Sequence, residues 1–256
     1  MARISTWVTR HHEHVGSHDL VHMQSGSATT DAGIKWAAAA IPRHYASGSE
    51  MASVLDSLGK AKAAKFLLGK VPIGIRARSG ELGEVIGTQY ATRELGYRML
   101  PRLRWKDSRE MPMRGDDLLG IRITVQGSLH FLKGEAKSRA YLSKSILKEA
   151  EAALLREHGR PSAHSLSFVA SRLFDLGEVD LSNKIKAAMI GTRIPLKQVT
   201  HLIFTFSGNN PRKMLREHTN SYKGRVRRLA VGLEVQEHQE FIRKAFREVT
   251  RNARTR

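Results

Sequence analysis

The chain contains no cysteine, and none of its apolar runs approaches the length of a membrane span. The absence of cysteine excludes disulfides and zinc–thiolate sites. A spanning helix needs roughly 18 or more consecutive apolar residues, so no membrane partner is expected. The first residues lead directly into polar, His-rich sequence without the apolar core of a secretory signal, and we therefore expect a cytoplasmic protein.

Two nucleotide-binding signatures are also missing. We find no Gly-x-Gly-x-x-Gly after a strand and no Walker-type Gly-Lys-Ser/Thr, which argues against nucleotide hydrolysis. Acidic residues are scarce: 24 Asp and Glu stand against 43 Lys and Arg, for a formal net charge of +19. A balance of this kind favours nucleic acid or an anionic membrane surface as the partner. Because the chain has no membrane segment, we expect its partner to be DNA or RNA.

The pattern of apolar residues predicts strands mixed with helices throughout the chain. With 256 residues and 41% hydrophobic content, the chain can bury a sizeable core. Helical spacing and end signals predict helices over residues 49–70, 81–95, 143–158, 165–176, 181–190, 211–218 and 241–249. Apolar and β-branched runs predict strands over residues 97–103, 121–125, 129–132, 200–206 and 229–235. We therefore predict an α/β fold with a mixed central sheet flanked by helices.

The first 48 residues are the least informative part. Five histidines, His11, His12, His14, His18 and His22, crowd into a short stretch and suggest a metal site, because imidazole is a common ligand. There is no His-Glu-x-x-His framework and no cysteine, so we favour an exposed or partner-facing polar segment. Residues 25–33 are typical of a loop, and a short helix from residue 36 is expected to be interrupted at Pro42.

The residues best suited to a catalytic site are Asp116-Asp117 and Glu135-Ala136-Lys137. Side chains alternate along a strand, so Glu135 and Lys137 point to one face and Ala136 to the other. Asp117 precedes Glu135 by one strand, a turn at residues 126–128 and a return strand, so the two acids can meet. A pair of carboxylates suits a hard cation, Mg²⁺ or Mn²⁺, which keeps its other positions for water and substrate phosphate. The surrounding apolar runs bury these acids, and a buried acid needs a partner.

Two further acids precede this stretch on the helix predicted from residue 81. Glu81 and Glu84 are three residues apart, so both can face the same site. Ordinary helix-start electrostatics is an equally good explanation for Glu81. Candidate DNA contacts are basic residues flanking the predicted elements: Arg76, Arg78, Lys144, Arg225 and Arg227.

The order of these motifs resembles a known core. A helix with Glu84, a strand, Asp117, a hairpin, Glu135-x-Lys137 and a helix is similar to the PD-(D/E)xK nuclease superfamily. More closely, Gly80-Glu81-Leu82-Gly83-Glu84, Arg114-Gly115-Asp116-Asp117 and Gly134-Glu135-Ala136-Lys137 resemble the HamA family, the nuclease subunits of the Hachiman antiphage defence system. One departure is Asp116-Asp117, where the family more often has an apolar residue before a single acid, so either aspartate is a candidate ligand.

The resemblance implies a restriction-endonuclease-like core over residues 76–256 and a helical amino-terminal lobe over residues 1–75. It also implies a DNA endonuclease that works beside a helicase subunit, HamB, which restrains it until foreign or damaged DNA is engaged. In this reading Asp117 and Glu135 hold Mg²⁺, Lys137 positions or activates the water, and Glu84 completes the site.

A second class of function stays open at this point. The chain is then a non-catalytic DNA-binding or regulatory subunit of a helicase complex, whose acids are structural and whose basic surface binds DNA. The convergence of an acid, Glu-x-Lys and a helical Glu favours the nuclease, since a purely structural sheet gives no reason for these charges at this spacing.

Overall fold

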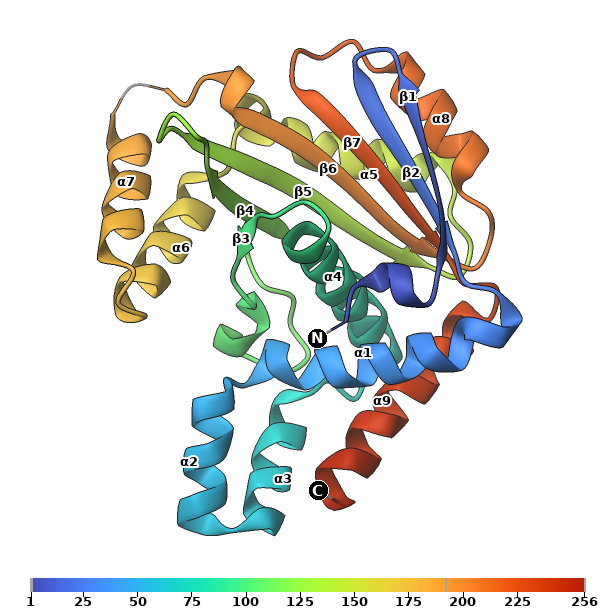
Figure 1. The fold of residues 1–256 in the computed structure, drawn as a ribbon, viewed down its shortest axis with the longest axis vertical. Coiled ribbons are helices and arrows are strands. Elements are labelled where there is room, and N and C mark those ends of the chain that lie inside the picture. The colour runs from blue at the N-terminus through green and yellow to red at the C-terminus, as the bar shows by residue number, and fades with distance from the viewer. Residues whose placement is uncertain (1, 192, 256) are drawn as a thin grey trace.

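A seven-stranded mixed sheet forms the centre of the molecule in the computed structural model, which describes residues 2–191 and 193–255 (Figure 1). Its strand order is β1-β2-β7-β6-β5-β4-β3. The strands are β1 (Thr9–Val15), β2 (His18–Gln24), β3 (Arg98–Met99), β4 (Leu118–Ile123), β5 (Leu129–Arg139), β6 (Val199–Ser207) and β7 (Arg227–Glu234). The predicted α/β class with a mixed sheet is confirmed.

Parallel and antiparallel strands occupy separate parts of this sheet. Strands β5, β6, β7 and β2 run parallel to one another. At one edge β1 pairs antiparallel with β2, and at the other edge β4 pairs antiparallel with β5 and β3 with β4. Strands β6 and β7 are buried and read as largely apolar runs, as expected where helices cover both faces of a sheet.

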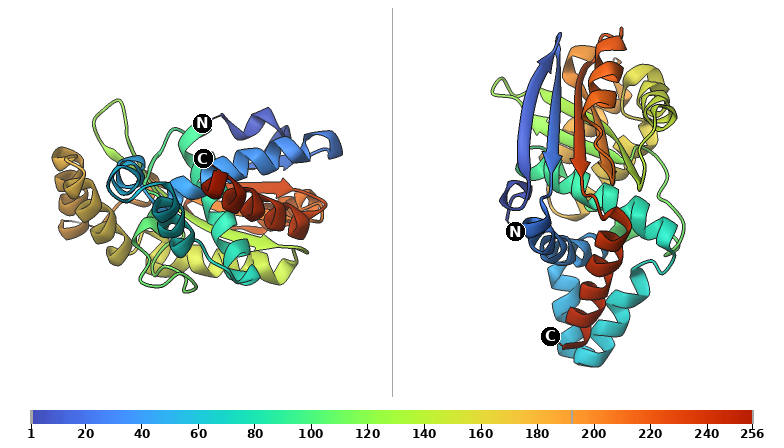
Figure 2. Two further views of the ribbon diagram at one scale, coloured as in Figure 1. Left: turned by 90° about the horizontal axis from the view of Figure 1, so that it is seen from below. Right: turned by 90° about the vertical axis from the view of Figure 1, so that its right-hand side faces the viewer.

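Helices cover the two faces unequally. On one face, α1 (Thr30–Tyr45), α4 (Ile75–Arg93) and α9 (His238–Thr255) share the largest apolar core with the sheet. On the other face, α5 (Lys144–Leu155) and α8 (Arg212–Ser221) pack on β2, β6 and β7, while α6 (Ala163–Asp175) and α7 (Val179–Ile190) cover the β4–β5 end. Helices α2 (Gly48–Leu58) and α3 (Lys60–Lys70) project from the sheet beside the end of α9 (Figures 1 and 2).

The amino-terminal segment differs from the expectation. The histidines lie on the β1–β2 hairpin: His11, His12 and His14 are exposed as expected, but His22 is buried, because β2 pairs with β7 inside the sheet. The expected amino-terminal lobe over residues 1–75 is therefore not entirely helical. Five residues of β2 are buried although two of them are Asp19 and His22, so polarity concealed this strand from a reading of apolar periodicity.

Several other boundaries were wrong. Helix α1 begins at Thr30, inside the loop expected over residues 25–33, and it continues through Pro42 to Tyr45. Pro42 removes one helical N–H, but its own carbonyl still accepts from the Ala46 N–H, so the last turn closes. The single helix expected over residues 49–70 is two helices, because Gly59 adopts a positive φ of 76°. The strand expected over residues 97–103 shrinks to Arg98–Met99, since Pro101 has no N–H to donate and a short 3₁₀ helix, Arg102–Trp105, follows.

Most of the remaining elements agree with the sequence prediction. Helices α5, α6, α7 and α8 and strands β6 and β7 lie within a few residues of their predicted positions, whereas α4 begins six residues earlier than predicted and α9 ends six residues later. Among the described residues, no helix is both long and apolar enough to cross a bilayer.

Candidate active site

Helix α4 carries Glu84 close to the sheet because glycines face the strands. A Cβ on Gly83 would lie 3.2 Å from Ser138 Cβ, and one on Gly87 would lie 2.9 Å from Leu118 Cδ1. Only glycine allows this approach without displacing a neighbour. Burial, and then the charge of Asp117, raises the pKa of Glu84 to about 8. Glu84 is therefore close enough to Asp117 for the two carboxyl groups to interact electrostatically.

Asp117 and Glu135 come together across that hairpin. Leu118 pairs with Gly134, which places the preceding Asp117 opposite Glu135. The Ala136 N–H donates to Asp117 Oδ2 at 3.1 Å and fixes this carboxylate against β5. Burial, followed by the charge of Asp117, raises the pKa of Glu135 to about 7, and burial also raises the pKa of Asp117. Burial and mutual repulsion therefore both oppose two negative charges on this pair.

Lys137 supplies the positive charge beside this pair. Its Nζ donates to Glu135 Oε1 at 2.8 Å, and the side chains of Lys137 and Glu135 are 17% and 14% exposed. Because residues 135 and 137 are two apart on β5, they share a face, as the sequence predicted. The structure thus brings Asp117, Glu135 and Lys137 into one cluster with Glu84 nearby.

Asp116 turns to different partners. Its Oδ2 accepts from the Ser162 N–H at 2.9 Å and from Ser162 Oγ at 3.2 Å, at the start of α6. Its Oδ1 lies 3.5 Å from the buried Lys133 Nζ, which also donates to the carbonyls of Arg156 and Arg160. Both oxygens of Asp116 are engaged in holding α6 and the turn that precedes it against the sheet, which favours Asp117 as the metal ligand.

Glu81 is likewise satisfied within the protein. Lys106 Nζ donates to its Oε1 and the Tyr45 hydroxyl donates to its Oε2, and all three side chains are buried. Burial still raises the pKa of Glu81, although both partners oppose that shift. Glu81 therefore joins α4 to α1 and to the loop before β4, and Glu84 is the better candidate for the site.

Arg102 supports the backbone around the two aspartates. Its side chain is buried, and its guanidinium donates to the carbonyls of Arg114, Asp116 and Asp117, the last at 2.9 Å. It shapes the backbone that presents Asp117, and its charge partly offsets those of Glu84 and Asp117. The only sequence signal for this role was its position just before a charged loop.

The five candidate DNA contacts fall at two ends of the parallel strands. Arg76 and Arg78 lie at the start of α4, where Ser79 Oγ is 2.9 Å from the Oγ of Ser138, the residue after Lys137. Lys144 begins α5, soon after β5, and pairs with Glu217 at 2.9 Å. Arg225 and Arg227 lie at the opposite end, where Arg227 pairs with Asp19 at 2.6 Å.

The donor set fits a hard cation at Asp117 and Glu135. Buried carboxyls with raised pKa values hold protons that a divalent ion can replace, and Mg²⁺ commonly takes one or two protein carboxylates with several waters. Glu84 does not form a compact group of three metal ligands with Asp117 and Glu135. Within residues 2–191 and 193–255, only His12, His14 and Asp19 bring three potential ligand atoms within 4.8 Å of one another.

Comparison with known proteins gives one family. No curated protein matches the chain. The model of the HamA family matches residues 2–249, nearly the whole chain, and covers every element from β1 to most of α9. The chain belongs to the HamA family, whose members are components of the Hachiman antiphage defence system.

Proposed function

We propose that the protein is a metal-dependent DNA nuclease, which hydrolyses phosphodiester bonds in an active site formed by Asp117, Glu135 and Lys137. The observation that supports this best is the meeting of two buried carboxyls of raised pKa and a lysine on one face of the β4–β5 hairpin. Structural ion pairs rarely require two acids to be held together against their own repulsion.

Each side chain has a role in this proposal. Asp117 and Glu135 hold Mg²⁺ or Mn²⁺, and Glu84 orients a water bound between them and α4. When bound, the cation polarises the scissile phosphate and offsets the charge that develops on it. Lys137 Nζ, held by Glu135 at 2.8 Å, orients the attacking water and adds a second positive charge at the phosphate.

We also infer that a helicase subunit restrains the activity. The HamA family belongs to a defence system of more than one subunit, and a free nuclease with a net charge of +19 would bind the DNA of its own cell readily. Restraint by the partner that detects foreign or damaged DNA removes this conflict.

A plasmid assay tests the nuclease. Glu135→Gln and Lys137→Met should each reduce Mg²⁺-dependent cleavage by about 100-fold or more, because each removes a group acting at the phosphate. Glu149→Gln, an exposed acid on α5, is the matched control and should cleave like the parent chain. All variants are assayed with the helicase subunit and its DNA trigger, and their folding is checked by thermal melting.

Undiminished cleavage by folded Glu135→Gln would reject the catalytic assignment. If the parent chain itself shows no cleavage with Mg²⁺ or Mn²⁺ in the triggered complex but still binds DNA, the protein is a DNA-binding or regulatory subunit instead.

A further inference from the structure

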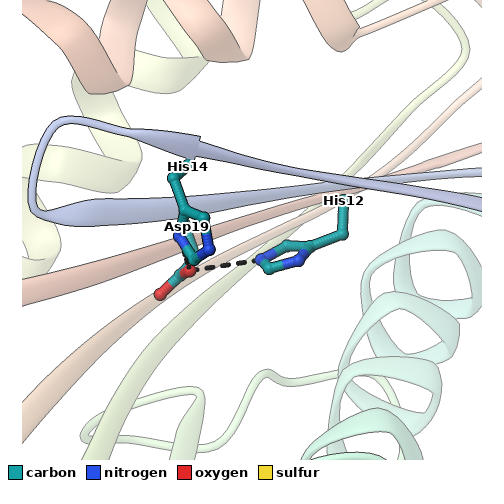
Figure 3. Close-up of side chains that lie close together, drawn as sticks. All are labelled: His12, His14 and Asp19. Carbon is teal, nitrogen blue, oxygen red and sulfur yellow. Dashed lines mark hydrogen bonds and ion pairs between the residues drawn. The ribbon is translucent and has the colours of Figure 1, made fainter.

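The β1–β2 hairpin places three metal-ligating side chains together, on different strands from the nuclease residues. His12 and His14 are two apart on β1 and so share a face, and His14 pairs with Asp19 across the hairpin. Figure 3 shows both imidazoles pointing toward the Asp19 carboxylate. The two rings lie edge to face with centroids 4.9 Å apart.

The distances suit one small cation. His14 Nδ1 and His12 Nε2 lie 2.9 and 3.2 Å from Asp19 Oδ1, and the three ligand atoms are all within 4.8 Å of one another. Bonds of about 2.0–2.2 Å in a tetrahedral site put neighbouring ligand atoms roughly 3.3 Å apart. Small side-chain rotations are enough to reach that geometry, because His12 and His14 are largely exposed.

The carboxylate is already oriented for this role. Arg227 donates to Asp19 Oδ2 through Nη2 at 2.6 Å and through Nε at 3.2 Å. Oδ2 is thereby occupied, which leaves Oδ1 directed at the two imidazoles. The Asp19 side chain is 8% exposed, so its position is set by packing as well as by this pair. Ligands held by outer partners in this way are typical of protein metal sites.

A cavity of about 560 Å³ opens beside the three residues. Its lining includes His12, His14 and Asp19 together with the cations Arg10, Arg122 and Arg225. Positive charge at this density opposes a bare divalent ion, but it attracts an anion that can complete the coordination. The cavity therefore supplies both an entry path and a favourable place for an anionic fourth ligand.

We propose that His12, His14 and Asp19 bind a transition-metal ion of the Zn²⁺ class, with the fourth position open to the basic cavity. Imidazole nitrogens favour Zn²⁺ and its neighbours over Mg²⁺, which selects oxygen ligands. The site is separate from the nuclease residues: His12, His14 and Asp19 lie on β1 and β2, and strands β7 and β6 stand between β2 and β5, which carries Glu135 and Lys137.

Titration of the untagged full chain with Co²⁺ and Zn²⁺ tests the site. After treatment with EDTA, we expect one equivalent of Co²⁺ to give the visible absorption of a four-coordinate ion, and Zn²⁺ to displace it. His12→Ala and His14→Ala should each weaken Zn²⁺ binding by at least tenfold, and a large excess of Mg²⁺ should not compete. Adding chloride or azide should change the Co²⁺ spectrum, because the open position faces the cavity.

His11→Ala is the matched control, since His11 lies on the opposite face of β1, beside Glu13 and Arg212. It should retain parental affinity. Both test histidines are exposed, so folding is expected to survive their loss, and melting curves without metal verify this. Equal weakening by His11→Ala, or no four-coordinate Co²⁺ spectrum in the folded parent chain, would overturn the proposal.

Discussion

At the scale of single residues, two adjacent aspartates with similar sequence signals have different surroundings. Asp117 is fixed by the Ala136 N–H and faces Glu135, while Asp116 is fixed by Ser162 and lies near Lys133. The family resemblance favoured Asp117, but the residues alone did not decide between the two aspartates, because the Ser162 partner of Asp116 lies at the start of α6, which follows more than forty residues later in the chain. The hydrogen-bond partners of the two side chains favour Asp117 as the metal ligand.

This difference predicts that the same Asp→Asn substitution changes metal binding at residue 117 and stability at residue 116. Asp117→Asn should weaken Mg²⁺ binding by about tenfold or more with little loss of stability, because it removes a ligand charge. Asp116→Asn should instead lower the free energy of unfolding by about 1–3 kcal/mol, because it leaves the buried Lys133 ammonium without its carboxylate. Calorimetric Mg²⁺ titration and urea denaturation of both variants measure the two quantities. The reverse order of Mg²⁺ affinities would transfer the ligand role to Asp116.

At the scale of elements, reading the sequence succeeded where apolar periodicity and end signals agreed. Strands β6 and β7 and helices α5, α6 and α7 are of this kind, and so is the turn at residues 126–128. It failed where long-range pairing stabilises a polar strand. β2 contains His18, Asp19 and His22, and its place in the sheet depends on β7, about two hundred residues away.

The candidate site was predictable to a similar extent. Alternation along β5 predicts that Glu135 and Lys137 share a face, and the short loop predicts that Asp117 lies opposite. The role of Arg102 was not predictable, since its partners are backbone carbonyls that carry no sequence signal. The same limit applies to Tyr45 and Lys106, which satisfy Glu81 from two distant segments.

Helix α4 gives a prediction at this scale. Gly87→Ala should lower the free energy of unfolding by about 1–2 kcal/mol, because the added methyl would lie 2.9 Å from Leu118 Cδ1 and 3.3 Å from Phe204 Cγ. This loss exceeds the gain of up to about 1 kcal/mol in helix propensity. Gly80→Ala on the same helix has nothing within 4 Å of the new Cβ, so it should be neutral or stabilising. Urea denaturation compares them, and equal stabilisation of both variants would argue against close packing of α4.

At the scale of the whole molecule, the net charge of +19 overstates the charge available for DNA. Arg102 and Arg228 are buried, Arg227 is paired with Asp19, and Lys144 is paired with Glu217. Arg78 donates to the Pro72 carbonyl and lies over the Phe246 ring. Arg76, by contrast, is exposed at the start of α4, at the end of the sheet that carries Lys137.

The salt dependence of DNA binding should reflect this distribution. The logarithm of the affinity for duplex DNA should fall linearly with the logarithm of the salt concentration, with a slope of about −0.9 for each phosphate contact. Arg76→Ala should make the slope less steep by about 0.9, whereas Arg251→Ala, whose guanidinium is held by Glu248 on α9, should leave it unchanged. Fluorescence anisotropy with a Glu135→Gln background and EDTA prevents cleavage during the measurement. A slope near zero would mean that the basic residues serve a protein partner, and equal changes in both variants would mean that DNA does not follow the α4 end of the sheet.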